Sequence, residues 1–208
     1  MIGSLLALLA LFAGCLTGYS LELPAWLTGH ELSTWLLYAL MAQVGMSIGS
    51  SRNLHDMVNH FKPRILLLPL ATALGTLCFS ALAPLLLDRW SLTDCLAVGS
   101  GFGYYSLSSL LITQLKQPTL GMQLAAELGT IALLTNIFRE IIALVGAPLL
   151  QRRFETFVPI SVAGVTSMDV ALPTLVQSCG QQVIPLAIFH GAVLDMSVPF
   201  LVSLFCGL

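Results

Sequence analysis

The sequence predicts an all-α integral membrane protein, and two observations support this. Of its 208 residues 57% are hydrophobic and 9% are charged, with a mean hydropathy of +0.92, which one water-soluble core could not bury. Runs without charged side chains cover residues 1–21, 32–51, 65–87, 95–115 and 170–194, and a spanning helix needs about 20 apolar residues. We expect about five spanning helices plus two re-entrant or discontinuous helical segments in a single membrane domain, residues 1–208.

Residues 1–94 are predicted to form a three-helix N-terminal part, with helices at about 2–19, 33–49 and 65–87. The first helix lacks a basic region before it and a small-residue cleavage site after it. We therefore interpret it as a membrane helix rather than a cleaved signal peptide.

The basic residues predict the orientation. Segment 52–64 holds the largest basic group, and Arg152 and Arg153 form a second. Both should be cytoplasmic by the positive-inside rule, while the acids and the tryptophan of 88–94 fit the outer face. Residues 95–150 must then cross the membrane an odd number of times.

Residues 95–208 are predicted to be a transport core with two broken-helix segments. Glycines interrupt 95–115, which we interpret as a hairpin entering from outside and ending at Lys116-Gln117-Pro118, before a long helix at about 119–150. Glycine, hydroxyl residues, Asp169 and proline break 162–177, which reads as a hairpin entering from the cytoplasm, before a final helix at about 183–205. Irregular backbone at membrane depth must line a polar cavity or be buried in protein. The alternative is two discontinuous helices that each cross fully.

A weak internal repeat supports the hairpins. An offset of 63 aligns Gly101 with Gly164, Gln114 with Gln177, Tyr104 with Ser167, Ser106 with Asp169, and Glu127 with His190. Two hairpin-plus-helix units entering from opposite sides, at about 95–150 and 158–208, would form the inverted-topology repeat typical of secondary transporters.

Asn136, Arg139 and Glu140 lie inside the long predicted helix, where Asn136 and Glu140 share one face. A charge at this depth costs about 2.5 to 3.5 kcal/mol and is usually functional or paired. We favour a functional Glu140. The alternative is a local ion-pair network or a side chain that reaches the interface.

Asp169 ends the stretch 164–169, whose Thr166, Ser167 and free carbonyls suit a cation or an ammonium group. Sodium could bind at Thr166 and Asp169. The alternative is that these side chains cap the next helix.

The stretch 100–109 combines glycines with Tyr104, Tyr105 and Ser106, which offer close backbone approach, aromatic faces and hydroxyls. Simple close packing of helices is the alternative. His190, with Glu127 and Asp195, could relay a proton, although a histidine satisfied by a neighbouring helix is as plausible.

Other classes find little support. A net charge of -2 without basic clusters argues against nucleic acid. The five cysteines form no C-x-x-C pair, and nothing indicates a metal centre or a cofactor. No hydrolase spacing stands out, so an enzyme is not expected. An intramembrane hydrolase stays open only if His190 meets a serine such as Ser106.

The strings SGFGYYSLS at 100–108 and GVTSMD at 164–169, with Asn136, Arg139-Glu140 and FHG at 189–191, resemble the bacterial lysine exporter family LysO over nearly the whole chain. The resemblance implies export of L-lysine and its analogue thialysine across the bacterial inner membrane. It also implies intramembrane acids required for transport, which would be Glu140 and Asp169. A proton-coupled carrier, or antiporter, is then expected, with sodium as the alternative ion.

Typical single-chain members of that family are longer, with an additional N-terminal membrane region. We therefore expect this chain to act with a small N-terminal membrane subunit, as a homo-oligomer, or alone. A membrane channel or scaffold subunit is the competing function.

Overall fold

The computed structural model describes residues 13–14, 16–18, 35 and 63–208, and the helices predicted at 2–19 and 33–49 lie almost wholly outside these residues. The chain divides into two units, Met1–Gln43 and Val44–Leu208. In the first unit the described residues are helical, and the hydroxyl of Thr17 donates to the carbonyl of Ala13 (2.9 Å).

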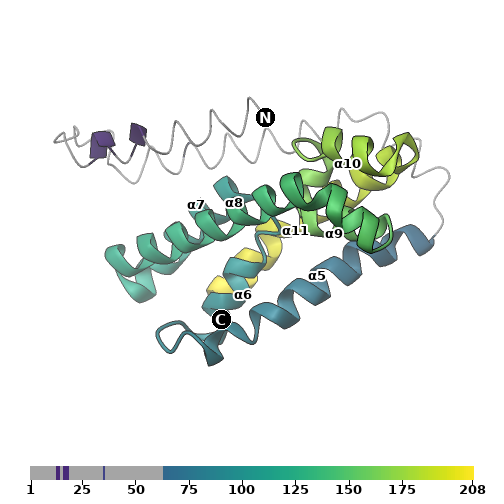
Figure 1. The fold of residues 1–208 in the computed structure, drawn as a ribbon. Helices are drawn as coiled ribbons and strands as arrows, with labels where there is room; N and C mark the ends of the chain where they lie inside the picture. The colour runs from purple at the N-terminus through teal and green to yellow at the C-terminus, as the bar shows by residue number, and fades with distance from the viewer. Residues whose placement is uncertain (1–12, 15, 19–34, 36–62) are drawn as a thin grey trace. The chain divides into compact units, whose positions relative to one another are not determined.

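The described part of the second unit consists of helices joined by short turns and contains no strand (Figure 1). Its elements in chain order are η1 (Pro63–Leu66), α5 (Leu67–Ser80), η2 (Ala83–Leu85), α6 (Leu92–Gly99), α7 (Tyr105–Leu120), α8 (Met122–Arg153), α9 (Phe157–Ala163), η3 (Gly164–Met168), α10 (Leu172–Cys179), η4 (Gln181–Val183) and α11 (Ile184–Gly207). An all-α fold, as the sequence predicts, is confirmed.

Among the described residues of this unit, three segments are long and apolar enough to cross a membrane: Leu67–Leu85, Met122–Arg153 and Gln181–Gly207. They correspond to the helices predicted at 65–87, 119–150 and 183–205. Many of their large apolar side chains are exposed, among them Leu74, Phe138 and Phe200. Such surfaces are expected where lipid is the solvent.

One face of α8 is built from small side chains. Its buried positions include Ala125, Ala132, Ala143 and Ala147, and Gly129 lies so close to α7 that an added Cβ would collide with Thr113. Small residues let helix backbones approach closely in membranes, where dispersion rather than the hydrophobic effect holds helices together. Because of this face, both broken segments can pack closely against α8.

The first broken segment is a hairpin. Ser91 caps α6 through a reciprocal capping box with Asp94, which starts the helix at Leu92. Lys116 Nζ, near the far end of α7, lies 2.9 Å from Asp94 Oδ1. Because the first turn of one arm meets the last turns of the other, both arms open at the same end. Lys116 and Pro118 lie within α7, so the predicted end of this hairpin was too early.

The second hairpin consists of α9 and α10. Ile160 of α9 and Leu175 of α10 share one buried cluster with Ala143 and Ala147, in the second half of α8. Its first arm starts at Phe157, five residues before the predicted 162. Figure 1 shows the two hairpins in opposite halves of the unit.

The elements repeat along the chain. Helix α6 begins at Leu92 and α9 at Phe157, 65 residues later, while α8 begins at Met122 and α11 at Ile184, 62 residues later. These intervals bracket the predicted offset of 63. Each of the two repeats is therefore a hairpin followed by a long helix, and the two hairpins lie at opposite ends of α8.

Candidate functional site

The tips of the two hairpins meet in the middle of the second unit. The backbone N–H of Val165 donates to the carbonyl of Phe102 (2.9 Å), which joins the break between α6 and α7 to the break between α9 and α10. Gly164 has φ +65°, and a Cβ there would collide with the Phe102 carbonyl oxygen. Only glycine allows this contact.

Asn136 of α8 holds the first tip. Its Oδ1 accepts from the N–H of Gly103 (2.7 Å), and its Nδ2 donates to the carbonyl of Ala132 (2.8 Å) and to Ser108 Oγ (3.3 Å). Gly101 packs so closely that an added Cβ would collide with the amide of Asn136. This asparagine is therefore part of the frame that shapes the break.

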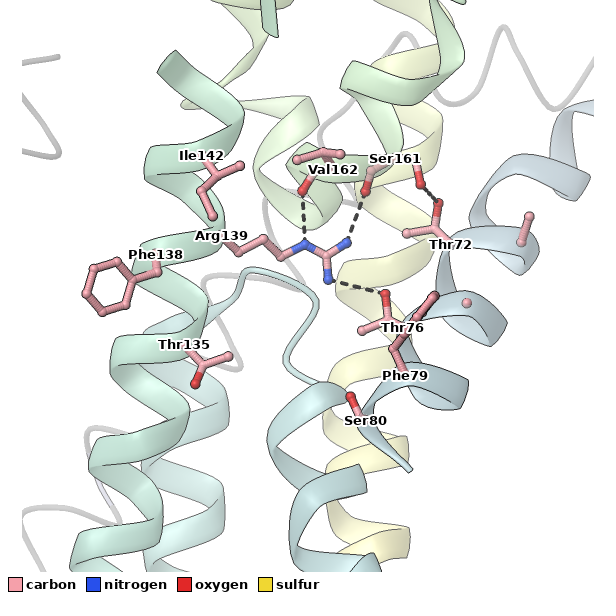
Figure 2. Close-up of a pocket in the computed structure, with 12 residues that line it drawn as sticks. Thr72, Thr76, Phe79, Ser80, Thr135, Phe138, Arg139, Ile142, Ser161 and Val162 are labelled. Atoms are coloured by element: carbon pink, nitrogen blue, oxygen red, sulfur yellow. Dashed lines mark hydrogen bonds between the residues drawn. The ribbon is translucent and has the colours of Figure 1, made fainter. Parts of the chain in front are cut away.

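Arg139, one turn further along α8, holds the second hairpin. Its guanidinium donates to the carbonyls of Val162 (2.9 Å) and Ser161 (3.0 Å) in the last turn of α9, and more weakly to Thr76 Oγ1 (3.4 Å). Figure 2 shows the side chain crossing from α8 to these acceptors. A cation at a helix C-terminus complements the helix dipole and satisfies carbonyls that the helix leaves free.

A chain of hydrogen bonds runs from this region through His190 of α11, which is fully buried. Nε2 of His190 lies 2.9 Å from Thr72 Oγ1, which lies 2.7 Å from Ser161 Oγ. On the other side Nδ1 lies 3.1 Å from Ser167 Oγ, whose hydroxyl donates to the carbonyl of Ala187 (2.8 Å).

The contacts of Ser167 fix the direction of one bond to His190. A serine has one O–H, and that of Ser167 is used, so Ser167 accepts from Nδ1–H of His190. Nε2 shares a hydrogen bond with the Thr72 hydroxyl, which is itself bonded to Ser161 Oγ. His190 therefore joins α5, α9, η3 and α11.

The acids gather around the tyrosines of the first break. Asp169 interacts electrostatically with Asp195 and with both Tyr104 and Tyr105, and Tyr105 also interacts with Glu140. Glu140 and Asp195 are buried, with exposed fractions of 5% and 2%. One carboxylate oxygen of Asp195 has no hydrogen-bond partner among the described residues. Asp169 is exposed. The site thus combines two buried carboxyl groups with one exposed carboxyl group.

A pocket of about 840 Å³ lies between α5, α8 and α9 (Figure 2). Its lining includes apolar side chains such as Phe79, Phe138 and Ile142, together with Arg139 and several hydroxyl side chains. No carboxylate occurs among the described residues that line it.

Two helices, α7 and α10, begin at the breaks. The N-termini of α7 and α10 follow Tyr104 and Ala171, and neither residue makes a side-chain capping bond. Backbone N–H groups at such ends attract a carboxylate. Buried acids and uncapped helix N-termini at the same crossing together match the two kinds of charge of an amino acid.

The predicted site residues separate into two groups. Electrostatic interactions link Asp169 to Tyr104 and Tyr105, and Glu140 to Tyr105, while Asn136, Arg139, Ser167 and His190 are engaged in bonds that hold the helices. Ser106 is partly buried in the first turn of α7.

The predicted helix cap at 166–169 does not form. The Thr166 hydroxyl donates to the carbonyl of Ala163, and α10 begins without a side-chain cap.

Two further outcomes differ from the sequence interpretation. Glu127 is not in the buried group but forms an exposed ion pair with Arg89 (2.7 Å). Thr72, Thr76 and Ser161, which the interpretation missed, contact His190 or Arg139. Two threonines four residues apart on an apolar helix were the available signal, because that spacing places them on one face.

Comparison with known proteins shows a clear relationship. The family described as "Lysine exporter LysO" matches residues 8–206. "Lysine exporter LysO" of Escherichia coli (strain K12) is 31% identical over 176 residues, covering 84% of this chain and 55% of that protein. A Haemophilus influenzae protein named "Putative lysine exporter" is 37% identical over 114 residues, covering 55% of this chain and 54% of that protein. The chain spans about half the length of these curated relatives. No solved structure matches significantly.

Proposed function

Because the chain belongs to the LysO lysine exporter family, we propose that it forms the transport core of a carrier that exports L-lysine, and its analogue thialysine, across the bacterial inner membrane. The name of its relatives supports the substrate. The observation that carries the mechanism is the contact between the two broken segments, Val165 N–H to the Phe102 carbonyl, beside buried carboxylates.

The residues around the contact would have two roles, binding the substrate and positioning the hairpin tips. Glu140 and Asp169 would bind the ammonium groups of lysine, and the tyrosines would add aromatic faces for the cation. The N-termini of α7 and α10 would receive the carboxylate of the substrate. Asn136 and Arg139 would position the tips rather than the substrate, since their polar atoms already bond to backbone.

The carrier would exchange protons for lysine. Moving a cation outward opposes the membrane potential by about 2.3 kcal/mol per charge per 100 mV, so an exporter needs a coupled ion. A carboxylate that binds either a proton or the ammonium of lysine, but not both, couples the movement of the two. Glu140 is the candidate for this carboxylate because it is buried. Sodium near Thr166 and Asp169 is the alternative ion.

The proposal is tested by efflux of labelled lysine from loaded cells that lack their own exporter. We expect saturable efflux from the parent chain and none from Glu140→Gln. Glu127→Gln is the matched control, because it makes the same change on the same helix at an exposed ion pair. Equal efflux from both variants, with each protein shown in the membrane, would exclude Glu140 from the mechanism.

The coupling ion is tested on the same variants in liposomes. If protons drive export, an inward proton gradient should accelerate lysine efflux and a sodium gradient should not. The reverse result would assign the coupling to sodium.

We further propose that transport requires either a second copy of this chain or a separate small membrane subunit. Reconstituting the purified chain in liposomes and measuring its mass in detergent would test it. Lysine transport by a monomer alone would contradict the requirement.

A further inference from the structure

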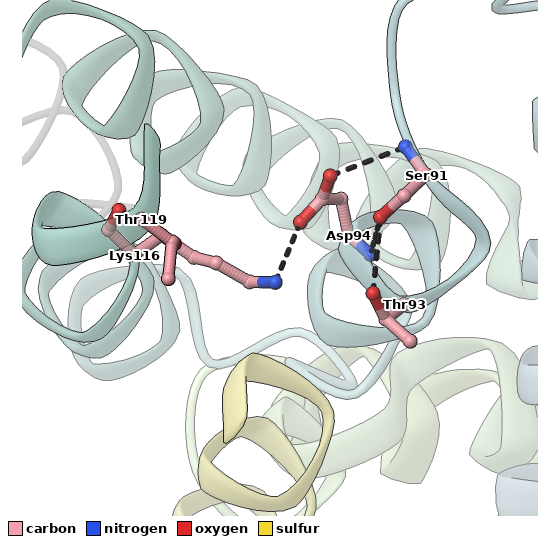
Figure 3. Close-up of polar contacts among 5 residues, drawn as sticks. All are labelled: Ser91, Thr93, Asp94, Lys116 and Thr119. Carbon is pink, nitrogen blue, oxygen red and sulfur yellow. Dashed lines mark hydrogen bonds and ion pairs between the residues drawn. The ribbon is translucent and has the colours of Figure 1, made fainter. Parts of the chain in front are cut away.

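A buried ion pair joins the two arms of the first hairpin, and the transport scheme above makes no use of it. Lys116 Nζ on α7 lies 2.9 Å from Asp94 Oδ1 on α6, and the two side chains are only 8% and 6% exposed. Figure 3 shows the ammonium reaching across to the carboxylate. A buried carboxylate at such a place needs a cation, because an unpaired charge in low dielectric is costly.

The two partners are held very differently. Asp94 is fixed by its own helix start, because Oδ2 accepts from the N–H of Ser91 (3.1 Å) and its N–H donates to Ser91 Oγ (3.1 Å). Lys116 Nζ has no further partner in the part of the chain that the structure describes. It stands at the end of a flexible four-carbon stem. The carboxylate is therefore preorganised, and the ammonium is the exchangeable partner.

The pair lies near the open end of the hairpin. Pro118 and Thr119, the next turn of α7, are exposed, so the Lys116 side chain is within reach of the surface. Arg152 and Arg153 are at the opposite end of α8, which the positive-inside rule assigns to the cytoplasm. By the same rule the ion pair lies toward the outer face, where an exported solute leaves.

We propose that the Asp94 carboxylate is an alkylammonium site that binds the side-chain ammonium of lysine on its way out, and that Lys116 occupies this site in the absence of substrate. The identity of the substrate rests on the proposed function, whereas affinity for an alkylammonium does not. Lys116 carries the same group as the substrate, a primary ammonium on four methylenes. It acts as a tethered competitor that yields to lysine and then displaces it.

The direct test is chemical rescue. Lys116→Ala removes a propylammonium fragment and leaves Asp94 without its partner. The thermal midpoint of this variant, purified in detergent, is followed while n-propylammonium, L-lysine or n-propanol is titrated. We expect a saturable rise with both ammonium compounds and no rise with propanol. The parent chain and the double variant Asp94→Asn/Lys116→Ala should not respond.

A folded Lys116→Ala variant that ignores propylammonium would overturn the proposal. The titration requires no transport, so it decides on the site even if the parent chain exports no lysine. Failure here is thus distinguishable from failure of the proposed function.

A second variant remains informative if Lys116→Ala does not fold. Lys116→Arg keeps the charge, but a guanidinium binds a carboxylate through two parallel bonds and is a tighter competitor. We expect lysine efflux to slow several-fold and to need more internal lysine for half-maximal rate. A purely structural ion pair would tolerate this change, so unchanged efflux would refute the tethered-competitor role.

Discussion

Gly164→Ala is the sharpest test of the contact between the two tips. Gly164 has φ +65° and ψ −132°, a conformation that costs a residue with a Cβ about 1 to 3 kcal/mol. The added Cβ would also collide with the carbonyl oxygen of Phe102. That oxygen accepts the hydrogen bond from Val165, so the collision should separate the breaks and break the bond.

The magnitude follows from these two effects. Losing the bond leaves a buried N–H unpaired, which costs about 1 to 3 kcal/mol. Added to the backbone cost, Gly164→Ala should lower the free energy of unfolding by about 2 to 6 kcal/mol. The assay is equilibrium unfolding in mixed detergent micelles, followed by circular dichroism. Lysine efflux should fall as well, because the tips no longer meet.

Gly146→Ala is the matched control. Gly146 lies inside α8, where an added Cβ would meet Leu150 at an ordinary 3.6 Å. Alanine favours a helix interior over glycine by about 1 kcal/mol, so this variant should be as stable as the parent or more so. If Gly164→Ala unfolds with the parent's free energy, the inferred contact between the tips is wrong.

Other substitutions test the supports of the site. Arg139→Lys should lower the free energy of unfolding by about 3 kcal/mol, because one ammonium cannot reach all the acceptors of the guanidinium. Arg152→Lys, exposed at the end of the same helix, should change it by less than about 0.5 kcal/mol in the same unfolding assay. Asn136→Ala should cost about 1 to 3 kcal/mol, since it leaves a buried N–H of the first tip unpaired, and thermal unfolding in detergent would measure it. Glu127→Gln breaks only the exposed pair with Arg89, so unfolding should shift by at most about 1 kcal/mol.

The hairpins were predictable from the sequence because glycine placement reports backbone geometry. Gly103 and Gly164 both have positive φ, at +100° and +65°, and each lies where the chain turns at a hairpin tip. The pair Arg152-Arg153 indicated an odd number of crossings by the positive-inside rule. Together these signals favoured hairpins and left two fully crossing broken helices as the alternative.

The partners of the charged residues were not predictable, because they come from distant segments. Arg139 bonds to carbonyls of Ser161 and Val162, more than twenty residues away. Because every residue has a backbone carbonyl, the residue type does not identify such an acceptor. Lys116 looked like the end of the hairpin because the run of uncharged residues stops there. Its partner Asp94 lies on the other arm, and only the closed hairpin brings the two charges together.

In the proposed carrier, substrate binding at Glu140 would move both hairpins through α8. Asn136 holds the first tip, and Arg139, three residues later, holds the last turn of α9. Glu140 follows directly and is buried beside Tyr105 of the first hairpin. A change of charge at Glu140 therefore acts on a helix to which both hairpins are bonded. We expect a disulfide engineered between the two tips to stop lysine efflux while preserving binding, because alternating access requires the hairpins to move against each other.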